Sequence, residues 1–124
     1  MLGRKPSFAV LFDMDGTIID SEPYWMASEQ SLAAEHNRTW TTIDSLDVIG
    51  KDLNESSKLF KERTNVPLGI DEIKNRLSND VQSKLSKEVP WRPGAKELLL
   101  ELRKRGVKTA LVTMSLHRMA QQVV

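Results

Sequence analysis

An uninterrupted apolar run that leads straight into two closely spaced aspartates constrains this 124-residue chain more than any other feature. The run occupies residues 8–12, and Asp13 and Asp15 follow it. Five apolar residues without alternation are typical of a strand buried on both faces of a parallel sheet. Because carboxylates repel each other at short range, a strand that ends in two of them indicates that their proximity is useful.

Three amphipathic patterns predict helices in the middle of the chain. The first helix is expected from Ser21, a capping residue, to His36. The second begins near Asp52, where an acidic residue three positions further on completes a capping-box pattern. The third follows Asp71, and its apolar residues recur at every fourth position with charge on the other faces.

A second strand pattern lies towards the end of the sequence. Residues 90–94, rich in Pro and Gly, mark a boundary, and a helix that ends at Gly106 follows them. Residues 107–113 then predict a strand with an apolar centre. Ser115 can cap one last helix, inside which the sequence ends.

The order of these elements predicts an α/β fold with a parallel sheet. We expect residues 1–18 and 90–124 to form the α/β core, and residues 19–89 to form an inserted helical cap. Residues 19–88 carry more acidic than basic side chains, and the remainder carries the reverse. This asymmetry agrees with a division of the chain, although two solvated surfaces of different composition would also produce it.

Composition argues against several classes of protein. The sequence has no cysteine, so it has no disulfide framework and no thiolate site, and we expect a cytoplasmic protein. No run approaches 18 apolar residues, so no membrane partner is expected. The basic cluster at residues 103–105 falls at a predicted helix end, where cations favour the helix dipole, so no nucleic-acid partner is expected either.

The two aspartates and the end of the second strand predict a phosphate site. In parallel α/β sheets, ligands bind beyond the carboxyl ends of the strands, and Thr113 ends the second strand. Mg²⁺ relieves the repulsion between carboxylates, and it prefers one or two of them together with water and phosphate. Ser115 opens a helix whose free amides suit an anion. The competing interpretation is a turn, but D-x-D-G-T is expected by chance about once in a thousand such chains.

Residues 8–17, FAVLFDMDGT, resemble the first motif of the haloacid dehalogenase-like hydrolase superfamily. Residues 110–115, ALVTMS, resemble its second motif. DSEPYW at 20–25 and WRPGAKELLLELRKRG at 91–106 resemble the branch with a small helical cap. That branch includes sugar-phosphate phosphatases, phosphoglycolate phosphatase and β-phosphoglucomutase.

The resemblance implies a Mg²⁺-dependent phosphatase of a small phosphomonoester such as a sugar phosphate. Asp13 would be the nucleophile that becomes an aspartyl-phosphate, and Asp15 would be the general acid and base. Both would hold the metal. The phosphoryl oxygens would be held by Thr113, Met114 and Ser115.

Two residues of the expected cap are weaker candidates for substrate contact. Glu22 resembles a family position near the cap hinge, and stabilisation of a helix N-terminus explains it equally well. Lys51 could reach from the cap towards the substrate, and a solvated lysine is the simpler interpretation.

Alternatives remain open within this resemblance. The family's later lysine and acidic pair are not among these residues, so we expect a catalytically incomplete N-terminal part of a hydrolase. A sugar phosphomutase is a second possibility, but Leu53 stands where relatives of β-phosphoglucomutase carry Arg. A third is a non-catalytic module that self-associates or binds a partner through its uncovered sheet.

Overall fold

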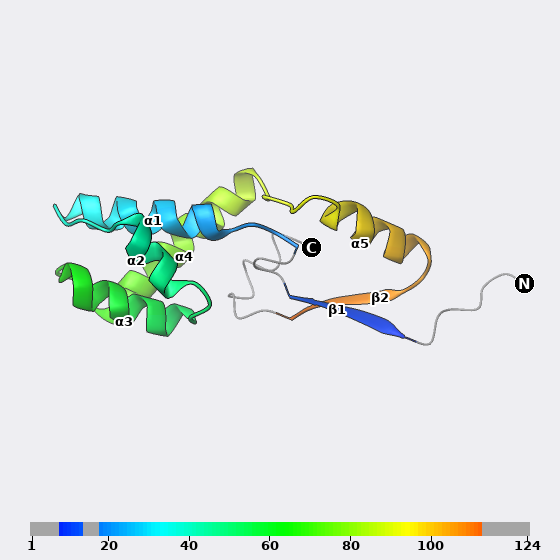
Figure 1. Ribbon diagram of the computed structural model, residues 1–124, viewed down its shortest axis with the longest axis horizontal. Coiled ribbons are helices and arrows are strands. Elements are labelled where there is room, and N and C mark those ends of the chain that lie inside the picture. The colour runs from blue at the N-terminus through cyan, green and yellow to red at the C-terminus, as the bar shows by residue number, and fades with distance from the viewer. Residues whose placement is uncertain (1–7, 14–17, 113–124) are drawn as a thin grey trace, which may run out of the picture.

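The computed structural model describes residues 8–13 and 18–112, without the side chains of residues 111 and 112, and it consists of two parts (Figure 1). Four helices pack together in one part, and two strands with a fifth helix form the other. The elements in chain order are β1 (Ala9–Asp13), α1 (Glu22–Glu35), α2 (Thr42–Val48), α3 (Leu53–Thr64), α4 (Ile70–Lys87), α5 (Ala95–Lys104) and β2 (Lys108–Val112).

Strands β1 and β2 form a two-stranded parallel sheet, which confirms the predicted α/β class. Their register runs from Ala9 opposite Lys108 to Asp13 opposite Val112, so the two strands end level with each other. Parallel neighbours need a crossover connection, and here that connection contains the five helices that the structure describes.

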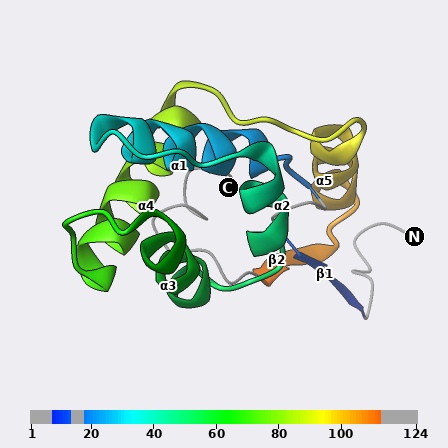
Figure 2. The same cartoon turned by 60° about the vertical axis from the view of Figure 1, so that its left-hand side comes forward.

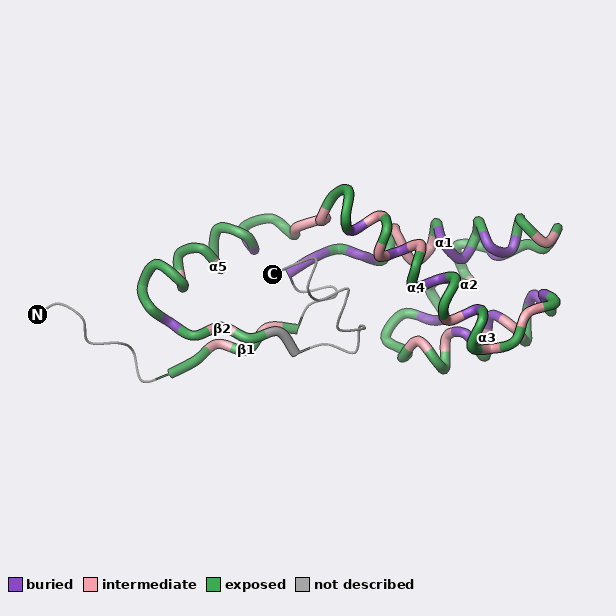
Figure 3. The backbone as a smooth tube through the Cα atoms, turned by 180° about the vertical axis from the view of Figure 1, so that it is seen from behind, coloured by how far each residue is buried: buried purple, intermediate pink, exposed green. Residues whose placement is uncertain are grey.

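The prediction that β1 is buried on both faces is wrong for the residues that the structure describes. Phe12 packs towards α5, but Leu11, on the opposite face, is 68% exposed, and Phe8 is 61% exposed. Figure 3 shows the same contrast, because exposed residues dominate the sheet whereas buried ones are concentrated in the helical part. The physical reason is that α5 covers one face of the sheet and no other described element covers the second.

The three predicted helices of the middle region are present, although the third begins at Ile70, so that Asp71, expected to precede it, lies in its first turn. Ser21 occupies the N-cap position of α1, but its side chain makes no capping hydrogen bond there. Asn37, beyond the end of the helix, adopts the left-handed conformation. The Asp52 side chain accepts a hydrogen bond from the Glu55 backbone amide at the start of α3, at 2.8 Å. None of the described helices is long and apolar enough to cross a membrane.

A fourth helix, α2, lies between the first two predicted ones, so the expectation of three helices there is wrong. Thr41 caps it and forms a reciprocal capping box with Asp44, whose carboxylate accepts from the Thr41 backbone amide. Arg63 of α3 also pairs with both Asp44 and Asp47 of α2. The capping pattern was present in the sequence, but the helix has only seven residues and its apolar Ile43 is exposed.

A hydrophobic core holds α1, α2, α3 and α4 together. The rings of Trp40 and Phe60 lie 5.0 Å apart between their centroids, tilted by 47°. Ile73 and Leu77, from the α4 stripe that the sequence predicted, are buried around them, and the stripe continues as Val81 and Leu85 in a second cluster with Ile18 and Ile19. The buried members of this core are Leu32, Ala33, Trp40, Val48, Phe60, Val66, Ile73 and Leu77.

The two connections between the helical part and the sheet part run side by side and hydrogen-bond to each other. The Asp20 amide donates to the Pro90 carbonyl at 2.8 Å, and the Arg92 amide donates to the Ile18 carbonyl at 2.9 Å. Ile18 and Ile19 are buried there, in a cluster with residues from α4 and α5. The pairing lies at the predicted boundaries, while the division into a core and a cap stays a prediction.

Burial in the helical core predicts that the same Ile→Ala change lowers the free energy of unfolding by very different amounts at two positions. Ile73→Ala removes a fully buried side chain and should lower the free energy of unfolding by about 2–5 kcal/mol. Ile43→Ala removes a side chain that is 70% exposed and should change it by no more than about 0.5 kcal/mol. Urea unfolding of both variants measures this, and equal losses would contradict the described packing of α4.

Candidate active site at the carboxyl edge of the sheet

Asp13 is the last residue of β1, and its backbone partner Val112 is the last residue of β2. Neighbouring strands lie about 4.8 Å apart, so the chain leaves the sheet at two adjacent points of one edge. This is the edge at which parallel sheets bind ligands. The parallel register therefore brings the ends of β1 and β2 together, as the site predicted from the sequence requires.

Asp13 is exposed at this edge, and along β1 it alternates with the half-buried Phe12. Four of the other predicted site residues lie outside the described residues. They are Asp15, Thr113, Met114 and Ser115. Their roles stay predictions.

The donor chemistry of Asp13 fits a hard divalent cation. Among residues 8–13 and 18–112, no group of three or more His, Cys, Asp or Glu side chains could hold a metal ion. Mg²⁺ does not require such a cage, because it commonly takes one or two protein carboxylates and completes its shell with water and substrate phosphate. An exposed carboxylate at a strand end meets that requirement in part.

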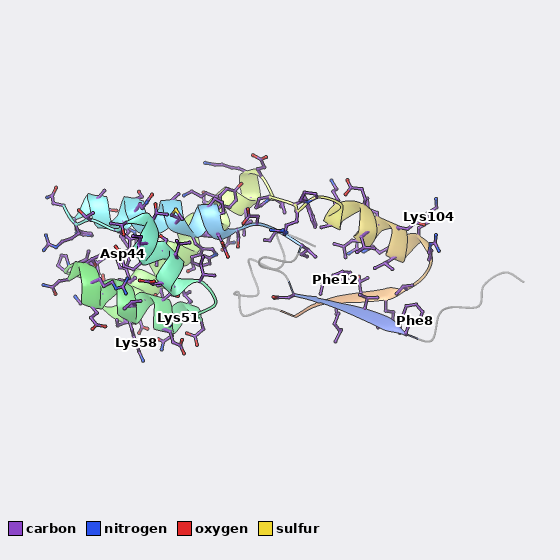
Figure 4. The ribbon with its side chains drawn as sticks, in the orientation of Figure 1. Phe8, Phe12, Asp44, Lys51, Lys58 and Lys104 are labelled. Atoms are coloured by element: carbon purple, nitrogen blue, oxygen red, sulfur yellow. The ribbon has the colours of Figure 1, made fainter. Side chains whose placement is uncertain are left out.

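Lys51 lies in the connection between α2 and α3, and it is exposed. In Figures 1 and 2 this connection is the portion of the helical part that extends towards the carboxyl end of the sheet, and Figure 4 labels Lys51 within it. The Lys51 amide donates to the Val48 carbonyl at 3.1 Å, which closes the turn. Gly50, just before it, has a φ of 81°, a conformation that residues with a side chain rarely adopt.

Glu22 is the first residue of α1 and is exposed. A carboxylate in the first turn interacts favourably with the positive end of the helix dipole. The structure thus gives Glu22 the structural role that the sequence offered as an alternative, and its role as a substrate contact stays a prediction.

Sequence reasoning missed one buried polar cluster in the helical part. Glu29 of α1 is only 4% exposed, and its Oε1 accepts from Trp40 Nε1 at 3.2 Å and from Ser45 Oγ at 2.9 Å. Burial raises the pKa of Glu29 to about 7, and the hydrogen bonds from Ser45 and Trp40 oppose part of that rise. No local pattern marks Glu29, because its burial depends on the position of α2.

Comparison with known protein families identifies the family of this chain. Residues 10–124 match the family described as haloacid dehalogenase-like hydrolase, and the chain belongs to that family. The resemblance to this family that the sequence indicated is thereby confirmed.

Two curated relatives match along most of this chain. A phosphorylated carbohydrates phosphatase from Thermotoga maritima is 25% identical over 112 residues, which are 90% of this chain and 52% of the relative. A mitochondrial (DL)-glycerol-3-phosphatase from Arabidopsis thaliana is 26% identical over 114 residues, which are 90% of this chain and 38% of the relative. The chain thus spans about half, or less, of these relatives' length.

Two solved structures share the fold. A putative β-phosphoglucomutase from Thermotoga maritima superposes with a TM-score of 0.71 at 24% identity, covering 93% of this chain and 53% of that one. CbbY from Rhodobacter sphaeroides, in complex with xylulose-(1,5)bisphosphate, superposes with a TM-score of 0.78 at 20% identity, covering 93% and 54%. The sheet and its helices therefore have the Rossmann-like core fold of this family in part.

The turn that carries Lys51 predicts a residue-specific effect at Gly50. A Cβ at this position would meet no atom within 4 Å, so only the left-handed backbone penalises a side chain. Gly50→Ala should lower the free energy of unfolding by about 1–2 kcal/mol, and Gly50→Asn by less, because Asn visits this conformation more readily. Urea unfolding distinguishes the two variants, and an Ala variant as stable as the wild type would disprove the described turn.

Proposed function

We propose that this chain contributes the nucleophile of a Mg²⁺-dependent phosphatase that hydrolyses a small phosphomonoester through an aspartyl-phosphate on Asp13. The observation that carries the proposal is the position of Asp13, at the end of β1 and level with the end of β2. Family membership supports hydrolysis as the reaction class. The names of the relatives, which include phosphatases of carbohydrate phosphates and of glycerol-3-phosphate, support a phosphomonoester as the substrate.

The proposed chemistry divides one displacement into two steps. A carboxylate oxygen of Asp13 attacks phosphorus, the bond from phosphorus to the leaving oxygen breaks, and Asp15 donates a proton to that oxygen. Asp15 then takes a proton from water, which attacks the phosphoryl group and releases inorganic phosphate and the Asp13 carboxylate.

The remaining roles concern charge and position. Mg²⁺, held by Asp13 and Asp15, would neutralise phosphoryl oxygens when bound, and phosphoryl transfer depends chiefly on such neutralisation and on positioning. We assign the binding of the phosphoryl oxygens to the segment Thr113, Met114 and Ser115. Lys51 is supported as a substrate contact by its place on the connection that extends towards this edge, and Glu22 remains the weaker candidate. A cytoplasmic location stays part of the proposal.

A phosphomutase is the less favoured alternative within the enzyme class. The α2–α3 connection is followed by the half-buried Leu53, the first residue of α3, where the mutase resemblance calls for Arg. An apolar side chain there cannot bind a second phosphate by charge. Solved relatives titled as mutases share the fold, but their low identity limits the comparison to fold.

The proposal predicts that Asp13→Asn abolishes phosphatase activity in the protein that contains this chain, because an amide cannot form the acyl-phosphate. Asp71→Asn makes the same change at an exposed position in the first turn of α4 and should leave the rate unchanged. Release of inorganic phosphate from a panel of phosphomonoesters, with Mg²⁺, measures both. Turnover by the Asp13 variant at the wild-type rate would refute the assignment.

The alternative of a self-associating module is supported by the exposed apolar Leu11 on the uncovered side of the sheet. If the 124 residues associate through this face, Leu11→Gln should reduce the mass measured by light scattering. Ile43→Gln, at an equally exposed site in α2, should not. The same preparation is predicted to show little phosphatase activity, and fast turnover from a monomer would reject both expectations.

A further inference from the structure

The buried carboxyl of Glu29 joins three elements of the helical part. It lies on α1, Ser45 lies on α2, and Trp40 lies in the connection that precedes α2. All three side chains are almost fully buried, at 4% exposure each. A polar group buried to this extent is costly unless it is hydrogen-bonded, so these contacts constrain how α2 packs against α1 within the apolar core.

The hydrogen bonds of this cluster are mutually dependent. Trp40 Nε1 lies 2.8 Å from Ser45 Oγ, and Ser45 Oγ donates to Glu29 Oε1 at 2.9 Å. The other side of Trp40 packs on Phe60 of α3. A change at Glu29 therefore reaches α2 through Ser45 and reaches α3 through Trp40.

No ion pair of the described residues includes Glu29. In the part of the chain that the structure describes, the hydrogen-bond partners of Glu29 are the uncharged Trp40 and Ser45. Arg38, in the connection, donates to the Thr64 carbonyl. The ion pairs on α1 to α4 are Arg63–Asp44, Arg63–Asp47, Arg76–Glu35 and Lys84–Asp80.

Without a cationic partner, Glu29 changes its charge close to neutral pH. Its pKa in the folded protein, about 7, exceeds the ordinary value of 4.5. The folded state therefore binds this proton more tightly, so stability falls as the pH rises from about 4.5 to 7 and levels off above that. An ionised carboxylate in this position favours any movement of α2 that admits water.

We propose that Glu29 is a positioning residue whose protonation state sets how α2 packs against α1, and thereby how the α2–α3 connection is positioned relative to the carboxyl edge of the sheet. The connection begins directly after the last residue of α2, and it carries Lys51. Protonated Glu29 holds the connection in the described position, and ionised Glu29 loosens it. The consequence for substrate binding rests on the proposed phosphatase function, whereas the consequence for α2 does not.

Nuclear magnetic resonance of the purified chain tests the structural claim without any activity. The Trp40 indole N–H and the Gly50 amide should titrate together, with a midpoint near 7. The chain has three tryptophans, and a Trp40→Phe variant identifies the Trp40 indole signal by its disappearance. Glu29→Gln should abolish both titrations, and Glu35→Gln, the same change on the exposed face of α1, should leave them.

A second variant keeps the test decisive if Glu29→Gln does not fold. Ser45→Ala removes a hydrogen bond that lowers the pKa of Glu29, so the midpoint should move upwards. A Trp40 midpoint that does not rise in this variant would overturn the proposal, as would a Gly50 amide that does not follow Trp40 in the wild type.

Kinetics of the full-length protein with para-nitrophenyl phosphate test the consequence. The KM of Glu29→Gln should equal that of the wild type at pH 6 and be about fivefold lower at pH 8, with little change in kcat. A KM ratio that does not change with pH would overturn the link between α2 and substrate binding. A complete lack of turnover by the wild type would overturn the proposed function, while the resonance titrations would still decide the role of Glu29.

Discussion

The parallel pairing of β1 with β2 is the constraint on which the candidate site depends. These strands are separated in the sequence by more than ninety residues, and they meet with Asp13 opposite Val112. A shift of register by one residue would reverse which side chains face α5 and would move Asp13 away from the level of the second strand end. The apolar residues of β1 therefore have a functional consequence, because they fix where the carboxylate emerges.

The position of the helical part also depends on the pairing of β1 with β2, because the two segments that connect it to the sheet part run side by side. The backbone hydrogen bonds of Ile18 and Asp20 with the 90–92 stretch tie the entrance to the exit. The buried isoleucines at positions 18 and 19 contact both parts through a single apolar cluster. This arrangement orients the helical part, so that its α2–α3 connection, rather than α1 or α4, extends towards the carboxyl edge (Figure 1).

Local signals in the sequence were sufficient to predict most helices and strands, but they were insufficient to predict which side chains are buried. The four-residue spacing of the α4 stripe and the capping Asp52 predicted their helices, because each signal lies within one element. The position of Asp13 at a strand end was also predicted. The exposed face of Leu11, the short helix α2 and the buried Glu29 were not, because each depends on which other element packs against it.

The central claim is that a carboxylate at this strand end attacks phosphorus, and trapping the intermediate tests it most directly. In a variant with Asp15→Asn, the first step can still proceed slowly, but the second lacks its base. Mass analysis of peptides, after brief exposure of the full-length variant to a phosphomonoester and Mg²⁺, should find one phosphoryl group on Asp13. A phosphoryl group on another residue, or none while phosphate is still released, would contradict the account.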